Sequence, residues 1–156
     1  MKLHRVACLF ALALCVACGS IGPIGPFSGG RLSGQEGDWP ANWNSASDVM
    51  QIQLETALED PDSVNLWLAV VDGEAYVASS LLSGANDPEQ REWVRSVGID
   101  PRVRVRIDGV VYVARLESVS EDSVKARVFE AFRLKYPHLE ESRGEGARYF
   151  RIASRS

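Results

Sequence analysis

The sequence predicts a mainly β domain with flanking helices, an α+β fold in which antiparallel strands form a small barrel. Two Asp-Gly dipeptides, Asp72-Gly73 and Asp108-Gly109, each lie between two apolar runs. This is a strong hairpin signal, because both central residues of the tight turn need positive φ. A short helix between the hairpins, and a helix and a closing strand after them, complete the pattern. Five or six antiparallel strands favour a barrel, since closure removes exposed sheet edges.

The elements before and between the hairpins follow from caps and periodicity. A first helix is expected from Ser47 or Asp48 to just before Pro61, with an apolar face of Val49, Ile52, Leu54 and Leu58. Residues 64–71 and 74–80 form the first hairpin. A short helix follows over 87–98, with Asp at its N-cap, Pro at its first position and Gly past its end.

The second half begins with a hairpin of strands 102–107 and 110–119. A two-residue turn places Arg102 opposite Arg115, Arg104 opposite Val113 and Arg106 opposite Val111. The next helix starts at Ser118 or Ser120 and stops at Pro137. Residues 149–153 form the closing strand. The buried stripe of this helix is expected to contain Val124, Val128, Ala131, Phe132 and Tyr136.

The N-terminus predicts a signal peptide over residues 1–17. Lys2 and Arg5 precede an uncharged apolar run that ends at Ala17. A spanning helix needs roughly 20 apolar residues, so this run is too short to remain as an anchor. Residues 14–18 resemble the bacterial lipobox, in which the final cysteine is lipidated and becomes the new N-terminus. Cys18 is therefore the expected lipidation site, and Gly19 after it favours the outer membrane, facing the periplasm.

Residues 18–47 are expected to form the lipidated cysteine and a flexible tether, because Gly, Ser, Pro and Asn dominate them. Trp39 and Trp43 either pack on the domain edge, which is favoured, or lie at the lipid headgroups. Residues 48–156 form the folded domain. All three cysteines lie within residues 8–18, so a disulfide scaffold is excluded.

Charge and residue types narrow the function classes. The formal net charge is −4, and removal of Lys2 and Arg5 makes it more negative. A nucleic-acid-binding protein would be basic, so nucleic acid is not an expected partner. No cluster has metal-ligand spacing. His138, at a helix end, is more typical of a surface residue than of a catalytic base, and catalytic residues stay unknown.

Two segments are candidate anion sites. Arg102, Arg104 and Arg106 share one strand face, and their guanidinium groups suit a phosphate or carboxylate. The alternative is a solvated outer face paired with surface acids. The stretch 79–84 contains Ser79, Ser80, Ser83 and Gly84, and leads into a helix N-terminus; such a turn can cradle a phosphate. The alternative is a plain loop.

Residues 49–154 resemble the split-barrel flavin-binding proteins of the pyridoxamine-phosphate-oxidase-like class. The branch that they resemble most is that of the deazaflavin-dependent nitroreductases and their relatives. The resemblance rests on a strand ending at Ser79, a Gly-containing loop, Trp93 on a helix, and Asp100-Pro101 before a strand of alternating Val. It implies an antiparallel split β-barrel of flavin-binding type. It also implies FMN or a deazaflavin as cofactor, held by Ser79, Ser80, Ser83, Gly84, Trp93 and Arg104.

The resemblance further implies a homodimer, because this barrel class builds its cofactor cleft between protomers. Two functions stay open. The first is a membrane-tethered flavin- or deazaflavin-oxidoreductase-like protein, active or degenerate, and the Ser, Gly, Trp and Pro positions that match the resemblance favour it. The second is a non-catalytic ligand-binding or envelope-interaction module. The absence of Lys and Arg between Ser80 and Gln90 favours the second.

Overall fold

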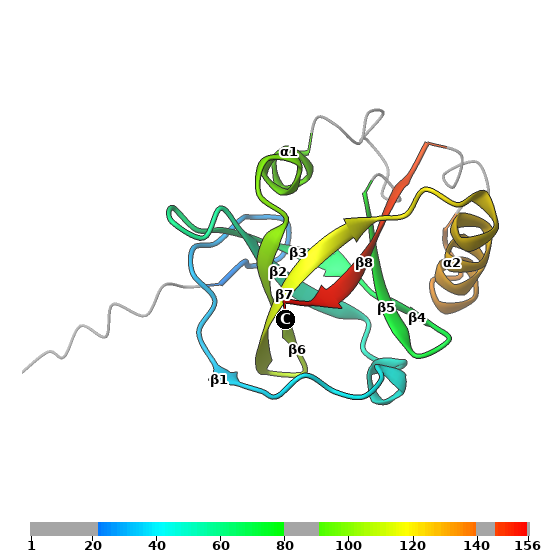
Figure 1. Cartoon of the computed structure of the whole chain (residues 1–156), viewed down its shortest axis with the longest axis horizontal. Helices are drawn as coiled ribbons and strands as arrows, with labels where there is room; N and C mark the ends of the chain where they lie inside the picture. The colour runs from blue at the N-terminus through cyan, green and yellow to red at the C-terminus, as the bar shows by residue number, and fades with distance from the viewer. Residues whose placement is uncertain (1–21, 80–90, 140–145, 156) are drawn as a thin grey trace, which may run out of the picture.

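The structure, a computed structural model, describes residues 22–79, 91–139 and 146–155. It confirms an antiparallel split barrel with flanking helices (Figure 1). The elements in chain order are β1 (Gln35–Glu36), η1 (Asn44–Ala46), β2 (Gln51–Thr56), β3 (Asp62–Trp67), β4 (Ala69–Val71), β5 (Glu74–Ser79), α1 (Glu92–Ile99), β6 (Arg102–Ile107), β7 (Val110–Ser118), α2 (Asp122–Lys135) and β8 (Arg148–Ser154).

Both Asp-Gly hairpins are confirmed. The turn residues adopt positive φ, 53° at Asp72, 80° at Gly73, 48° at Asp108 and 81° at Gly109. In the second hairpin the predicted register is also confirmed: β6 and β7 pair Arg102 with Arg115, Arg104 with Val113 and Arg106 with Val111. The turn chemistry therefore determines the register of this hairpin.

The barrel closes where the chain passes from β3 to β4. The strand order is β3-β2-β6-β7-β8-β5-β4, so β3 and β4 lie at opposite ends of the sheet path. Leu68 alone joins them, and it is fully buried. The single strand predicted over 64–71 is therefore two strands, each paired to a different edge. The central core contains the inward side chains Ile52, Leu54, Val77, Val103, Val105, Phe150 and Ile152.

The helix predicted from Ser47 or Asp48 is wrong. Residues Gln51–Thr56 form β2, which pairs with β3 on one side and β6 on the other. Ile52 and Leu54 are buried, as the alternation of a strand requires. The helical prediction relied on the spacings of Val49 to Ile52 and of Leu54 to Leu58, but Ile52 and Leu54 are two residues apart and would not share a helix face. The segment is a strand because β3 and β6 both supply backbone hydrogen-bond partners along it.

The flexible tether expected over 18–47 does not hold for the described residues 22–47, which wrap around the barrel. Leu32 and Trp43 are buried, and the Gly37 N–H donates to the Val111 carbonyl at 3.0 Å. The favoured packing of Trp39 and Trp43 on the domain is confirmed: both rings meet Tyr112 edge to face, at 6.5 and 5.0 Å between centroids. Aromatic and leucine side chains thus bind a Gly-rich segment that could not fold alone.

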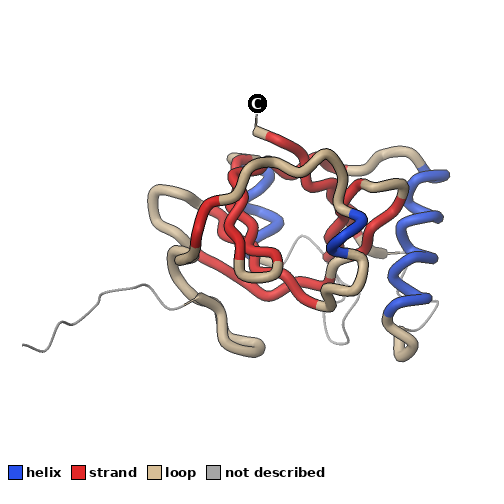
Figure 2. The backbone as a smooth tube through the Cα atoms, turned by 90° about the horizontal axis from the view of Figure 1, so that it is seen from below, coloured by secondary structure: helices blue, strands red, loops and turns tan. Residues whose placement is uncertain are grey.

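The two helices pack on different parts of the barrel (Figures 1 and 2). In α1, Trp93, Val94 and Val97 contribute to the central core. In α2, the predicted stripe faces inward: Val128, Phe132 and Tyr136 are buried, with Val124 and Ala131 half-buried. The predicted serine cap is wrong, because Glu121 precedes the first turn. Among the described residues, no helix is long and apolar enough to cross a membrane.

Candidate functional site

A groove of about 370 Å³ lies between α1 and the ends of β7 and β8. Its walls combine cationic, hydroxyl and apolar side chains. Leu116 and Ser118 on β7, and Arg148 and Phe150 on β8, are two residues apart and so point to the same face of their strands. The residues lining the groove are Val94, Arg95, Val97, Gly98, Ile99, Leu116, Ser118, Arg148 and Phe150.

Ser79 lies next to this groove because it pairs with Arg148. The two residues are partners at the last register position of β5 and β8. Ser79 is 2% exposed and shares the inward face of β5 with Val77. Arg148 is half-buried, and its guanidinium carbon lies 5.6 Å from the Phe150 ring centroid. The strand-end serine predicted from the sequence thus has a cationic neighbour.

That neighbour was not predicted. A basic residue for a phosphate was expected between Ser80 and Gln90, in the same stretch of sequence as Ser80 and Ser83. The structure brings Arg148 to Ser79 from β8, which follows almost 70 positions later in the chain. The strand pattern could have indicated where Arg148 points, because Arg148, Phe150 and Ile152 are spaced two apart and so share one face of the closing strand. Pairing of β8 with β5 could not be derived from local sequence.

Trp93 packs against a residue that lines the groove. It is 4% exposed, and its ring meets Phe150 edge to face at 5.4 Å between centroids. Phe150 in turn forms part of the groove wall. Trp93 therefore orients α1 against β8, and the described structure places it in the core. Its predicted contact with a cofactor stays a prediction.

Of the other predicted site residues, Ser80, Ser83 and Gly84 lie outside the described residues. Arg104 is described, and the structure does not bring it to Ser79. It lies on β6, with β7 and β8 between it and β5. Arg104 also points outward, because its neighbours Val103 and Val105 face the core.

Arg104 instead joins the barrel to the N-terminal segment. Its Nη1 donates to Glu55 Oε2 and to the Leu32 carbonyl, both at 2.9 Å. Glu55 is fully buried, and its Oε2 also accepts the Leu32 N–H at 2.6 Å. Nearby, Arg106 donates to the Ser33 carbonyl at 2.8 Å. The arginines of this face are thus paired, as the alternative expected, but the face is not solvated: residues 32–33 cover it, and the acid, Glu55, is buried.

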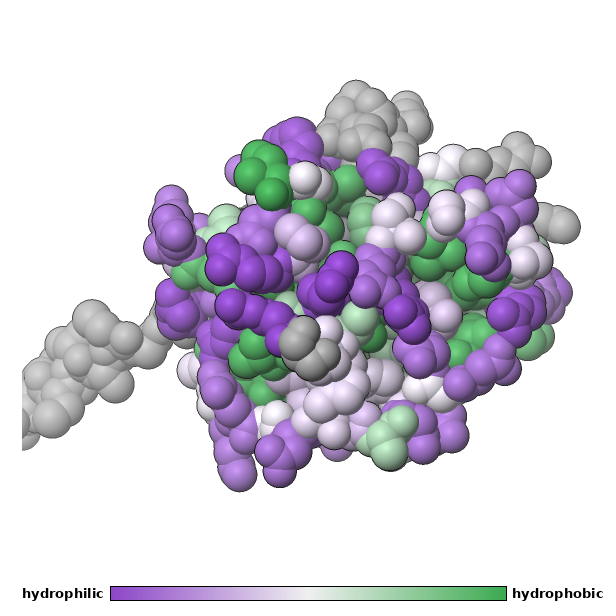
Figure 3. Space-filling model, viewed as in Figure 1, coloured by the Kyte–Doolittle hydropathy of each residue, from purple (hydrophilic) through white to green (hydrophobic). Residues whose placement is uncertain are grey.

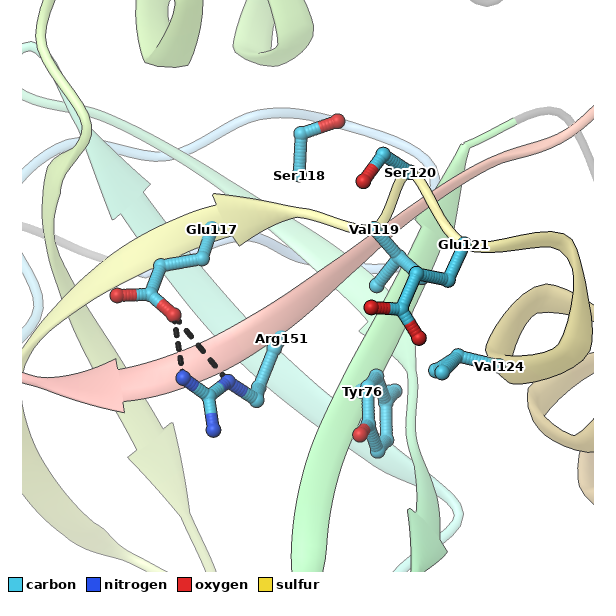
Figure 4. Close-up of a pocket in the computed structure, with 8 residues that line it drawn as sticks. All are labelled: Tyr76, Glu117, Ser118, Val119, Ser120, Glu121, Val124 and Arg151. Atoms are coloured by element: carbon cyan, nitrogen blue, oxygen red, sulfur yellow. Dashed lines mark hydrogen bonds and ion pairs between the residues drawn. The ribbon is translucent and has the colours of Figure 1, made fainter.

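A second cavity, of about 310 Å³, lies between β5, β7, β8 and the start of α2 (Figure 4). Its cation, Arg151, donates to Glu117 Oε2 at 2.6 Å and to Glu74 Oε2 at 3.4 Å. The bond to Glu117 raises the pKa of Arg151 above its ordinary value. Burial, followed by the charge of Glu74, raises the pKa of Tyr76. Two carboxylates therefore neutralise the charge of this arginine.

The donor set of the α1 groove fits a phosphate attached to a planar apolar group. Each guanidinium has five N–H donors in a planar fork, which match phosphate oxygens. Arg148 and Arg95 come from two elements, and Ser118 adds a hydroxyl. Ser79 is buried beside Arg148 and does not itself line the groove. Leu116 and Phe150 offer apolar surface, and the volume is within the usual range of small-molecule sites. Among the residues that the structure describes, no group of acidic, His or Cys side chains could hold a metal ion.

One protein family matches the sequence of this chain. The model described as F420H(2)-dependent quinone reductase matches residues 61–150, from just before β3 into β8. The match includes Ser79, Trp93 and Arg148. Among curated proteins, no sequence match is found.

Solved structures share the fold. The conserved hypothetical protein Rv2991 from Mycobacterium tuberculosis is 20% identical, with a TM-score of 0.56 over 80% of this chain and 87% of that one. HutZ, a heme storage protein from Vibrio cholerae, is 12% identical, with a TM-score of 0.56 over 71% and 85%. The F420-H2 dependent reductase FDR-A is 15% identical, with a TM-score of 0.51 over 67% and 94%. At these identities the likeness shows the fold alone.

Proposed function

The chain belongs to the F420H(2)-dependent quinone reductase family, and from this premise we propose that it is a lipid-anchored oxidoreductase. It would hold a deazaflavin or FMN by the phosphate in the α1 groove. The observation that carries this proposal is the pairing of Arg148 with Ser79 at the mouth of the barrel. It supplies the basic residue that the sequence of residues 80–90 lacks, and so favours an active site over a degenerate one.

The described residues would bind the cofactor through polar contacts to its phosphate and apolar contacts to its ring. Arg148 and Arg95 would donate to phosphate oxygens, with Ser118 as a hydroxyl donor. Leu116, Phe150 and the apolar side of α1 would pack against a planar ring and exclude water from it. When bound, the cofactor would supply hydride transfer. The chain would contribute orientation and a neutralising charge for the phosphate.

Titration of the chain from residue 19 onward with FMN, and separately with reduced deazaflavin, tests this proposal. Saturable quenching of cofactor fluorescence is expected in the micromolar range. Arg148→Gln should weaken binding about ten- to a hundredfold, the value of a charge-assisted hydrogen bond. Arg127→Gln is the matched control, because Arg127 pairs with Asp72 away from the groove. If neither cofactor binds, or both variants bind like the parent chain, the groove is not the cofactor site.

The membrane part of the proposal rests on Cys18. Lipid on this residue would hold the barrel at the outer membrane, facing the periplasm. Two or three acyl chains make such an anchor durable, whereas one chain binds only marginally. Cys18→Ser should move the protein from the membrane fraction to the soluble fraction. A variant that stays in the membrane fraction would exclude the lipid anchor.

A homodimer completes the proposal. The α1 groove lies between α1 and the barrel, and a second barrel could cover a ring bound there. Sedimentation of the chain from residue 19 onward, with and without FMN, measures this. A monomer at all concentrations, still binding FMN, would exclude a shared cleft.

A further inference from the structure

Two large apolar side chains are exposed on one tight turn near the start of the described chain. Ile24 is 66% exposed and Phe27 is 74% exposed. Their backbones form a small closed pair: the Ile24 N–H donates to the Phe27 carbonyl at 3.2 Å, and the Phe27 N–H to the Ile24 carbonyl at 3.1 Å. Gly25 between them has φ 56°, which suits a glycine. The turn therefore presents both side chains together.

The barrel holds this turn in place. Asn65 on β3 donates to the Gly25 carbonyl at 2.9 Å, and Gln53 on β2 donates to the Pro23 carbonyl at 3.2 Å. Just after the turn, Gly29 and Ser63 exchange two backbone hydrogen bonds of 2.8 Å. A turn fixed by two strands cannot fold its apolar side chains away from water. Exposed apolar groups kept in this manner indicate a contact surface.

The position of the turn in the chain identifies what it contacts. Only residues 19–21 lie between Cys18 and Gly22, the first described residue. Four extended residues span at most about 14 Å. The sequence had suggested a tether of about thirty residues, which would let the barrel move freely above a membrane. With residues 22–47 wrapped on the barrel, a lipid on Cys18 would hold the turn at the membrane surface.

We propose that the turn 24–27 is a membrane-docking element, with Ile24 and Phe27 inserted at the boundary of headgroups and acyl chains. This inference rests on the lipid anchor of the proposed function. Apolar side chains of interfacial elements reach about 5–10 Å into this boundary. The membrane would then meet the barrel on the side where β2 and β3 carry the turn. The anchor and the turn together set the orientation of the barrel, which a flexible tether would not.

Residue 27 of the full, lipidated protein can report this contact. After maturation Cys18 carries lipid, so Phe27→Cys introduces the one free thiol for an environment-sensitive fluorophore. Leu134→Cys is the matched control: Leu134 is 73% exposed on α2. In both views α2 lies on the opposite side of the barrel from the point where the described chain begins (Figures 1 and 2). Ile24→Cys serves if Phe27→Cys does not fold.

The proteins are reconstituted in vesicles whose lipids carry a nitroxide quencher near the top of the acyl chain. A blue-shifted emission and loss of fluorescence at position 27, but not at position 134, are expected. Equal, weak quenching at both positions, with the protein still in the vesicle fraction, would overturn docking and leave the lipid anchor standing. Blue-shifted emission at 27 without lipid quenching would show that a second copy of the chain covers the turn. Loss of the protein from vesicles would refute the anchor, and docking with it.

Discussion

Tyr136→Phe tests how the barrel closes at Leu68. The buried Leu68 N–H donates to the Tyr136 hydroxyl at 3.0 Å, and this hydroxyl lies 2.6 Å from the Met50 carbonyl and 3.0 Å from the Leu68 carbonyl. Phenylalanine keeps the ring stacked on Trp67, where the centroids are 4.3 Å apart and the planes differ by 6°. The substitution therefore removes the hydroxyl and little else.

The expected loss of stability follows from one orphaned donor. A buried N–H without a partner costs about 1–3 kcal/mol. The Leu68 carbonyl keeps a second donor, Lys135 Nζ at 3.0 Å, so it does not add fully to this cost. A loss of about 2 kcal/mol lowers the melting temperature of a domain this size by roughly 4–8 °C. Burial raises the pKa of Tyr136 to about 12, so the hydroxyl stays neutral and the effect should not vary between pH 5 and 9.

Urea unfolding measures the loss, with the slope unchanged and the midpoint lowered. Tyr112→Phe is the control, because the contacts of Tyr112 are those of its ring with Trp39 and Trp43. Tyr136→Leu should cost more than Tyr136→Phe, since it also removes the stacked ring. If Tyr136→Phe unfolds within about 0.5 kcal/mol of the parent chain, the ordinary range for surface changes, then the hydroxyl does not hold the β3–β4 junction.

Three further predictions follow from the barrel. Arg104→Leu removes the close ion-pair partner of the buried Glu55 carboxylate, and should lower the free energy of unfolding in urea by about 3–5 kcal/mol. The double variant Glu55→Leu/Arg104→Leu should lose less, because neither charge is then buried alone. A double variant as unstable as the sum of the two single variants would refute this. Hydrogen bonds from Arg102 lower the pKa of Asp100 to about 2, so the contribution of Asp100 to stability is present above pH 3.8 and is lost as the pH falls through 2. Arg102→Gln should return this pKa toward 3.8 in an NMR titration, and an unchanged pKa would contradict the pairing. Gly73→Ala should destabilise the fold by about 1–2 kcal/mol or more, because φ is 80° and the new Cβ would lie 3.1 Å from Asn42 Cβ. Gly109→Ala, with φ 81° and no neighbour within 4 Å of the new Cβ, should destabilise the fold less. The reverse order of stability in calorimetry would refute the contact with Asn42.

Local signals predicted the second half of the fold well. Asp108-Gly109 determines both the turn and the register of β6 with β7, because the backbone conformation of a two-residue turn depends on those two residues. The stripe of α2 was also readable, since burial recurs with the helical period. The first helix was wrongly predicted because Val49–Ile52 and Leu54–Leu58 have helical spacings. The alternation of buried Ile52 and Leu54 fits a strand instead, and β3 and β6 pair with it on both sides.

The candidate site was only partly predictable. Ser79 was found from its place at a strand end before a Gly-containing loop, and the groove does lie beside it. Arg104 was chosen because alternating arginines suit an anion, but the structure pairs it with Glu55 and Leu32. Arg148 was not predicted, because its place beside Ser79 depends on the pairing of β8 with β5.

By itself, the sequence determined the Asp-Gly turns, the helical stripe of α2 and the features that resemble a lipidated N-terminus. Each of these depends on residues within a few positions of one another. Only the tertiary structure decided that β3 and β4 separate at Leu68, that residues 22–47 wrap the barrel, and that Arg148 meets Ser79. These contacts join residues far apart in the chain, so their partners are set by the closure of the whole barrel and not by local propensity.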